Sequence, residues 1–321
     1  GYTFDVGPEC EFFLFNADEN GRPTTITNEQ AGFFDMGPLD NGENARRDIV
    51  LTLEDMGFVV EASHHEKAPS QHEVDFRYDE ALTTADNIMT FKLAVKTIAK
   101  HHGLHATFMP KPRKEFCGSG MHINMSLRKD GRNIFDDPNG ENGLSKEAYY
   151  FMGGVMKHVK GICAVTNPLV NSYKRLKPGF EAPVYVAWST LGANTLIRVP
   201  NMRGEHTRIE LRSPDPAANP YLAFAACLMA GLDGIRNQIE PPAEVQDNIN
   251  ILSEDEAQAR GLEKLPTDLL DACMEMKKDT LLKDLVGDRV FDQYYESKIA
   301  AWKEYDSQVT SWEIESYLYK F

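Results

Sequence analysis

Cysteine is scarce in this 321-residue sequence, and no two cysteines form a C-x-x-C pair. The five that occur are widely spaced and odd in number: Cys10, Cys117, Cys163, Cys227 and Cys273. This usage indicates neither a disulfide framework nor a zinc ribbon. A reducing cytoplasm is therefore the expected compartment.

Long hydrophobic runs are missing too, and so is an excess of positive charge. No run reaches the length of a membrane span, and the first residues do not resemble a signal peptide. Lys and Arg number 34 against 49 Asp and Glu, which gives a formal net charge of -15. A surface of that sign repels phosphate backbones and anionic lipids, so we expect no contact with nucleic acid or membranes. Some of these carboxylates could instead gather around cations.

The sequence contains no Walker A loop and no Rossmann glycine fingerprint, so any nucleotide site must be built in another way. The chain starts at Gly1, without an initiator Met, and runs almost directly into a strand pattern. We therefore expect it to be part of a longer protein.

Helical periodicity predicts helices over 43–56, 79–102, 146–159, 221–236 and 267–276, with more in the last forty residues. The apolar stripe expected on 79–102 includes Leu82, Ala85, Ile88, Met89, Leu93, Val95, Ile98 and Ala99. Helices and strands are interspersed without regular βαβ alternation. This arrangement favours an α+β fold with an antiparallel sheet.

Four strand-like segments carry ionisable side chains on one face: residues 7–15, 73–78, 121–127 and 208–212. In the first, Glu9 and Glu11 point one way and Cys10 the other. A single segment of this kind is usually the solvated face of an antiparallel sheet. These faces, however, carry Glu, His, Arg and Asn, the residue types of metal and phosphate sites, so together they indicate a shared cavity.

Such a cavity would hold five carboxylates: Glu9, Glu11, Glu66, Glu73 and Glu210. Like charges a few ångströms apart raise one another's pKa, and divalent cations remove that conflict. Oxygen ligands with one imidazole suit Mg²⁺ or Mn²⁺. Two such ions beside arginines suggest phosphoryl transfer, with the reaction left open.

The motifs that surround these residues are GPECEFF (7–13), HHE (64–66), QHE (71–73), MPKP (109–112), GSGMH (118–122), NSYKRL (171–176), PGFEAP (178–183), IRVP (197–200), RIELR (208–212) and PDPAANPYL (214–222). In content, order and spacing they resemble class I, bacterial-type glutamine synthetases from end to end. The resemblance implies ATP-dependent ligation of ammonia to glutamate through γ-glutamyl phosphate, with two divalent metals, Mg or Mn. It also implies an antiparallel half-barrel surrounded by helices, and a homododecamer of two hexameric rings.

The resemblance further assigns roles to single residues. The metal on the glutamate side takes Glu11, Glu66 and Glu73. The metal on the nucleotide side takes Glu9, His122 and Glu210. Without the family context, a histidine such as His122 is more often a satisfied, solvent-facing residue.

Substrate roles carry over in the same way. Glutamate is implied to meet Gly118, Arg175, Arg212 and the flap residue Glu181. The catalytic pair is implied to be Glu181, which helps take a proton from the amine, and the phosphate-contacting Arg198. ATP is implied to lie near Glu61, Asn124, Ser126, Arg198 and Tyr78. A lone arginine is more often a surface ion pair, and Tyr78 is equally well explained by strand packing.

Several features depart from the family pattern. Residues 1–321 correspond to the catalytic domain, and we expect the family's small N-terminal β-grasp domain, which completes a neighbouring subunit's site, to lie outside this chain. Ala193 stands where the family usually has an arginine, and Cys117 stands where it has an asparagine that binds glutamate. These changes leave two alternative functions open, a γ-glutamyl–amine ligase or a non-catalytic nucleotide-binding homologue.

The loop 247–252 has no tyrosine, and in this the chain resembles the non-adenylylated branch of the family.

Overall fold

The computed structural model describes residues 1–27, 29–192 and 194–321. Its strands are β1 (Tyr2–Cys10), β2 (Phe12–Asn16), β3 (Val60–His65), β4 (Gln71–Phe76), β5 (Asp79–Glu80), β6 (Leu104–Thr107), β7 (Met121–Lys129), β8 (Arg132–Asn133), β9 (Trp188–Ser189), β10 (Ile197–Arg198) and β11 (Ile209–Leu211). Its α-helices are α1 (Glu43–Asp55), α2 (Ala81–His101), α3 (Lys146–Thr166), α4 (Ser172–Arg175), α5 (Pro220–Asn237), α6 (Glu254–Ala259), α7 (Leu269–Lys278), α8 (Leu281–Val286), α9 (Asp288–Asp306) and α10 (Ser311–Tyr317). The prediction of an α+β fold with antiparallel sheets is confirmed.

The strands form two sheets rather than one. The larger has the order β5-β1-β7-β11-β10-β9, with β8 on the edge of β7, and the smaller has the order β3-β4-β2-β6. All pairs are antiparallel except β9–β10. The chain passes from the larger sheet to the smaller at Glu11, between β1 and β2. The two sheets therefore meet at one of the predicted site residues.

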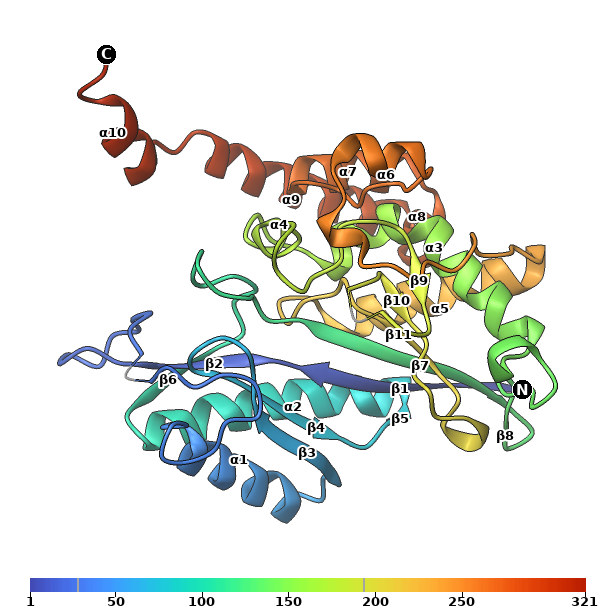
Figure 1. Ribbon diagram of the computed structural model, residues 1–321, viewed down its shortest axis with the longest axis horizontal. Coiled ribbons are helices and arrows are strands. Elements are labelled where there is room, and N and C mark those ends of the chain that lie inside the picture. The colour runs from blue at the N-terminus through green and yellow to red at the C-terminus, as the bar shows by residue number, and fades with distance from the viewer. Residues whose placement is uncertain (28, 193) are drawn as a thin grey trace.

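Helices cover the sheets from two sides (Figure 1). α1 and α2 pack on the smaller sheet and on β1, while α3, α5 and α7 pack together on the opposite side. The predicted helices all exist, and α3 continues seven residues past its predicted end at Val159. The apolar stripe predicted for α2 is partly wrong, because Leu82, Met89 and Leu93 are exposed and Phe91 is buried instead.

α3 and α5 approach each other through glycines. A Cβ atom on Gly234 would lie 1.9 Å from the carbonyl oxygen of Tyr150 and 2.7 Å from Gly154 Cα. Nearby, His158 of α3 lies between two carboxylates, with Nδ1 2.7 Å from Asp279 and Nε2 2.9 Å from Asp233. These contacts join α3, α5 and the end of α7 into one packed layer.

Candidate functional site

Glu9, His122 and Glu210 come from adjacent strands of the larger sheet. β1, β7 and β11 lie side by side, and the register sets Glu9 opposite His122. His122 Nδ1 lies 3.0 Å from Glu9 Oε2 and 3.5 Å from Glu210 Oε1. One ligand atom from each residue lies within 4.8 Å of the other two. This set, the His122 group, is close enough to share one cation.

A second set, the Glu66 group, consists of His64, Glu66 and Glu73 on the hairpin β3–β4. Antiparallel pairing sets His64 opposite Glu73, and His64 Nδ1 lies 3.4 Å from Glu66 Oε1. The three again offer ligand atoms within 4.8 Å of one another. Glu66 and Glu73 were predicted to act together, and the structure brings them together.

Glu11 lies beside the Glu66 group. Its Oε2 accepts hydrogen bonds from the Gln71 side-chain amide at 2.8 Å and from the Gly120 N–H at 2.9 Å. The structure therefore groups His64, rather than Glu11, with Glu66 and Glu73. Glu11 and Glu66 nevertheless line the same small cavity.

The carboxyl groups of the site differ in their affinity for protons. Burial raises the pKa of Glu11 to about 8, and the charge of Glu66 acts in the same direction. Burial also raises the pKa of Glu66, and raises that of Glu73 well above its usual value. For Glu9 burial is outweighed by hydrogen bonding to His122 and by the histidine's charge, which lower its pKa to about 2. A divalent cation would favour the charged carboxylates that burial disfavours in Glu11, Glu66 and Glu73.

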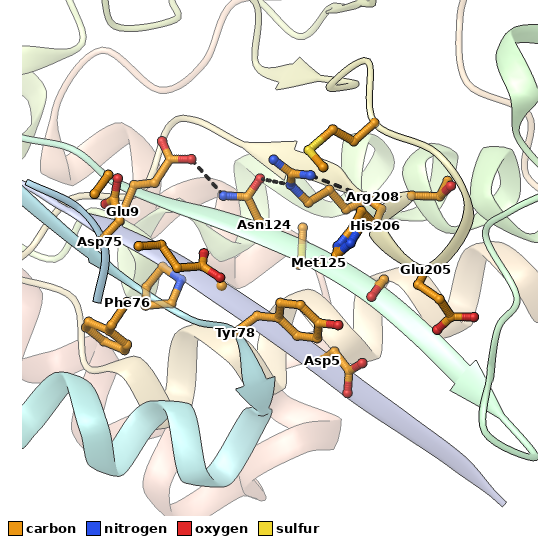
Figure 2. A pocket seen from close by; sticks show the side chains of 17 residues that line it. Asp5, Glu9, Asp75, Phe76, Tyr78, Asn124, Met125, Glu205, His206 and Arg208 are labelled. Atoms are coloured by element: carbon orange, nitrogen blue, oxygen red, sulfur yellow. Dashed lines mark hydrogen bonds between the residues drawn. The ribbon is translucent and has the colours of Figure 1, made fainter. Parts of the chain in front are cut away.

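A pocket of about 300 Å³ opens on the Glu9 side of the two groups (Figure 2). The residues predicted to meet ATP that line it are Glu61, Tyr78, Asn124 and Ser126. Asn124 connects two charges across the pocket, because its Nδ2 donates to Glu9 Oε1 at 2.9 Å and its Oδ1 accepts from Arg208 Nε at 3.0 Å. Phe76 and Met125 add apolar surface, so the lining suits a ligand with a flat apolar part and a charged end.

A much smaller cavity, of about 30 Å³, lies on the other side of the two groups. The residues predicted to meet glutamate all line it: Gly118, Arg175, Glu181 and Arg212. Only glycine fits at Gly118, because a Cβ atom there would lie 2.2 Å from the carbonyl oxygen of Pro110. Arg175 is 3% exposed and is held by the carbonyl oxygens of Ser213 at 2.8 Å and Arg212 at 3.1 Å.

Glu210 is fully buried and forms ion pairs with both Arg198 and Arg212. Arg198 thus contacts the His122 group from β10, while Arg212 reaches it from the end of β11. Arg212 Nε is buried and has no hydrogen-bond partner among the residues that the structure describes. Cys117 lines the small cavity, whereas Ala193 lies outside the described residues.

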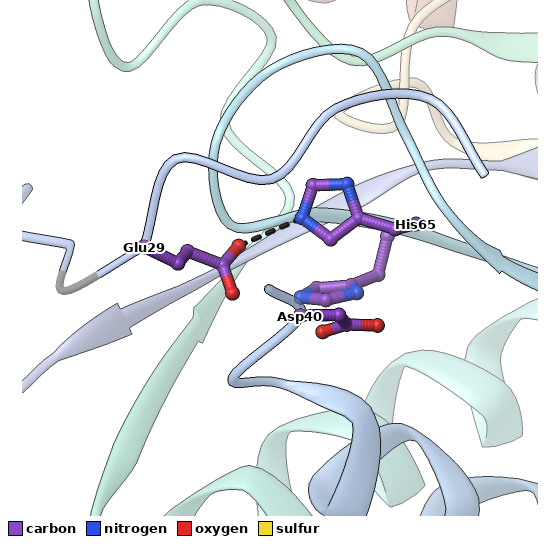
Figure 3. A group of neighbouring side chains, drawn as sticks. Glu29, Asp40 and His65 are labelled. Carbon is purple, nitrogen blue, oxygen red and sulfur yellow. Dashed lines mark hydrogen bonds and ion pairs between the residues drawn. The ribbon is translucent and has the colours of Figure 1, made fainter. Parts of the chain in front are cut away.

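A buried set of charges supports the hairpin that carries Glu66 (Figure 3). Its four possible ligand residues, with ligand atoms within 4.8 Å of one another, are Glu29, Asp40, His65 and His72. His65 uses both ring nitrogens, with Nδ1 2.6 Å from the carbonyl oxygen of Glu66 and Nε2 2.7 Å from Glu29 Oε1. Both contacts are satisfied when both nitrogens carry hydrogen. Burial opposes that state, but the hydrogen bond to Glu29 raises the pKa of His65.

The second carboxylate of this set is Asp40, and its ion pair with Arg46 is 2.5 Å long. Arg46 also lies 2.9 Å from His72 Nδ1, and Glu29 is bonded to His65, so these contacts connect Glu29 and α1 to β3 and β4.

Three residues of the site were not assigned a role from the sequence. His64 belongs to the HHE motif, so its position beside Glu66 was a usable signal. Arg208 alternates with Glu210 and Arg212 along one strand, which was also a signal. His206 lines the larger pocket from a 3-10 turn at Gly204–His206, and no periodic pattern marks it.

The geometry is that of a carboxylate-rich site with room for cations between a large pocket and a small arginine-lined cavity. The family described as "Glutamine synthetase, catalytic domain" matches residues 1–317. Glutamine synthetase of Clostridium saccharobutylicum is 60% identical over 321 residues, all of this chain and 72% of that protein. Glutamine synthetase of Staphylococcus aureus is 54% identical over 322 residues, all of this chain and 72% of that protein.

Solved structures show the same likeness. A structure titled GmaS/ADP complex has a TM-score of 0.88 at 36% identity, covering 99% of this chain and 73% of that one. The Plasmodium falciparum glutamine synthetase has a TM-score of 0.86 at 28% identity, covering 98% and 75%. The chain belongs to the glutamine synthetase family, and residues 1–317 match its catalytic domain. Among the described residues, no helix is long and apolar enough to cross a membrane.

Proposed function

We propose that this protein ligates ammonia to the γ-carboxylate of L-glutamate at the expense of ATP, giving L-glutamine, ADP and phosphate. The observation that carries this proposal is the position of the two ligand groups between a pocket of about 300 Å³ and an arginine-lined cavity. Phosphoryl transfer requires a nucleotide on one side of divalent cations and an acceptor on the other. The γ-carboxylate of glutamate attacks the γ-phosphate, and ammonia then displaces phosphate from γ-glutamyl phosphate.

Two divalent cations, Mg²⁺ or Mn²⁺, would neutralise charge on the phosphoryl group during its transfer. The His122 group would hold the cation on the nucleotide side. Glu66 and Glu73, with Glu11, would hold the cation on the glutamate side. The oxygen-rich donor set with imidazole fits these ions.

The remaining roles follow the two cavities. Arg175, Arg212 and the Gly118 backbone would bind glutamate, and Arg198 would contact the phosphates. Glu181 would accept a proton from the amine and keep water away from the acyl phosphate. Glu61, Asn124 and Ser126, which line the larger pocket, would bind ATP, and the ADP complex of the similar GmaS supports a nucleotide site in this fold.

The decisive experiment measures ADP and glutamine formed by the full-length gene product with ATP, glutamate, ammonia and Mg²⁺ or Mn²⁺. We expect both products in equal amounts and no turnover with excess chelator. Failure to form glutamine from ammonia would refute the proposal. ADP formation only with larger amines would instead identify a γ-glutamyl–amine ligase, the second candidate, which Cys117 in the glutamate-side cavity favours. Nucleotide binding without turnover would identify a non-catalytic homologue.

One variant tests the departure at position 193. The family usually has an arginine at this position, so Ala193→Arg is expected to raise turnover by restoring that cation. Unchanged turnover would show that Ala193 does not lower the rate of the reaction.

We also infer a ring-based homododecamer that belongs to the non-adenylylated branch of the family and works in the cytoplasm. Exposed apolar side chains support assembly, among them Leu82 and Leu93 on α2 and Trp312 on the outlying α10 (Figure 1). The absence of tyrosine in the loop 247–252 supports the branch, and five unpaired cysteines fit a reducing compartment. Light scattering and intact-mass measurements on the full-length protein test the first two inferences.

A further inference from the structure

The flap residue Glu181 has a cationic partner that comes from a distant part of the chain. Its carboxylate is bonded to the Lys67 ammonium group, 114 positions earlier in the sequence. Lys67 follows Glu66 directly, in the turn between β3 and β4. Both side chains are 43% exposed, so this ion pair lies at the mouth of the small cavity rather than in its floor.

Two further contacts hold the same segment against the cavity. The Cys117 side chain lies beside the backbone of Glu181. The ring of Phe180 lies 3.2 Å from the Lys111 ammonium group, a cation–π contact. The described flap is therefore in a closed position.

The closed position leaves little space beneath the flap. The cavity there measures about 30 Å³, whereas the pocket on the Glu9 side measures about 300 Å³. Glutamate can enter only when the flap opens, and opening must break the Lys67–Glu181 bond because the two residues lie on different segments.

The chemistry of the bond has a second consequence. The lysine side chain ends in a primary ammonium group, which resembles an ammonium ion in charge and in hydrogen-bond donors. It occupies an oxygen of the carboxylate that, in the proposed function, receives the amine nucleophile. A lysine here and an ammonium ion compete for one acceptor.

We propose that Lys67 is a positioning residue that latches the flap and competes with ammonium for Glu181. The proposal rests on the proposed function, which gives Glu181 its role toward the amine. Exposed ion pairs contribute only about 0.2–1 kcal/mol, so the latch is weak enough to open in every catalytic cycle. A bond of that strength corresponds to a change of about 1.4- to fivefold in an apparent binding constant.

The test compares Lys67→Met with the wild-type full-length enzyme, because methionine keeps an unbranched stem of similar length and removes the charge. We expect the KM for ammonium to fall about threefold, while the KM for ATP stays unchanged. We also expect more ADP per glutamine, since a looser flap admits water to the acyl phosphate. Lys67→Arg keeps the ion pair and should behave like wild type.

Lys160→Met is the matched control. Lys160 forms an exposed ion pair of 2.5 Å with Glu263, away from both cavities, and its removal should change none of these quantities. A general effect of losing one surface charge would appear in both methionine variants.

Hydrogen exchange over residues 177–183 gives a readout that does not depend on activity. Faster exchange in Lys67→Met than in Lys160→Met supports the latch, and equal exchange refutes it. Faster exchange with an unchanged KM for ammonium refutes the competition. If the wild-type enzyme forms no glutamine, the proposed function fails, and the exchange experiment still decides whether Lys67 holds the flap.

Discussion

Binding of a divalent cation to this site should release protons, because the carboxyl groups that receive the cation are partly protonated without it. Glu11 has a pKa of about 8, raised first by burial and then by the charge of Glu66. At pH 7 about nine-tenths of the Glu11 carboxyls then carry a proton, and at pH 9 only about one-tenth do. A bound cation requires the carboxylate. Glu11 alone should therefore release about 0.9 proton per chain at pH 7 and about 0.1 at pH 9.

Titration calorimetry with Mn²⁺ measures this release when it is repeated in buffers of different ionisation enthalpy. The slope of the observed enthalpy against the buffer enthalpy gives the number of protons released. The apparent affinity should also rise close to tenfold per pH unit between pH 6 and pH 7. Glu11→Gln should lower the slope at pH 7 by about 0.9 proton. Glu115→Gln, a change at an exposed carboxyl outside both cavities, should leave it unchanged.

The raised pKa of Glu11 also makes the stability of the folded protein depend on pH. The folded pKa of Glu11 is raised, so the folded chain binds more protons than the unfolded chain, and stability is lost as pH rises from about 4.5 through about 8. The cation-free protein should thus have a lower Tm at pH 8 than at pH 6, and saturating Mn²⁺ should raise Tm more at pH 8. A binding enthalpy for Mn²⁺ that does not depend on the buffer at pH 7 would contradict the predicted proton release. It would also contradict a cation site at Glu11.

Three other predictions concern the support of the site and its nucleotide side. Gly234→Ala should destabilise the protein by about 2–3 kcal/mol in urea titrations, because the added Cβ would overlap a backbone carbonyl of α3. Gly32→Ala is the control and should not destabilise it, because the nearest atom to a Cβ there is Asp35 Oδ2 at 3.8 Å. His158→Gln should cost about 2 kcal/mol at pH 6 and less at pH 9, since its carboxylate partners raise the pKa of His158 against the effect of burial; an equal loss at both pH values would refute this. Arg208→Ala should raise the KM for ATP about tenfold, which corresponds to a loss of about 1.4 kcal/mol in ATP binding, and should leave the KM for glutamate unchanged. Equal changes in both constants would instead indicate a general structural role for Arg208.

Prediction from the sequence succeeded where one local pattern carried the information. Helical periodicity and end signals located α1, α5 and α7 to within two residues. Alternation along 121–127 and 208–212 correctly put His122 and Glu210 on strands. These patterns depend only on backbone geometry, which is the same in every fold.

Prediction was weaker wherever two distant segments decide the outcome. The stripe expected on α2 included Leu82, Met89 and Leu93, which lie exposed because the sheet covers another face of that helix. His64 was assigned no role although it lies with Glu66 and Glu73, and the hydrogen bond from Gln71 to Glu11 was not foreseen. The partners of such residues are chosen by strand register, which one segment cannot reveal.

The sequence by itself determined the class of fold, the types of side chain available for cations and phosphates, and the family likeness. Each of these follows from local spacing and from the order of motifs along the chain. Only the tertiary structure decided that Lys67 meets Glu181, that Arg198 and Arg212 share Glu210, and that a closed cavity and an open pocket flank the two ligand groups. These facts arise when the two sheets meet at Glu11, and they depend on distances between segments that are far apart in the chain.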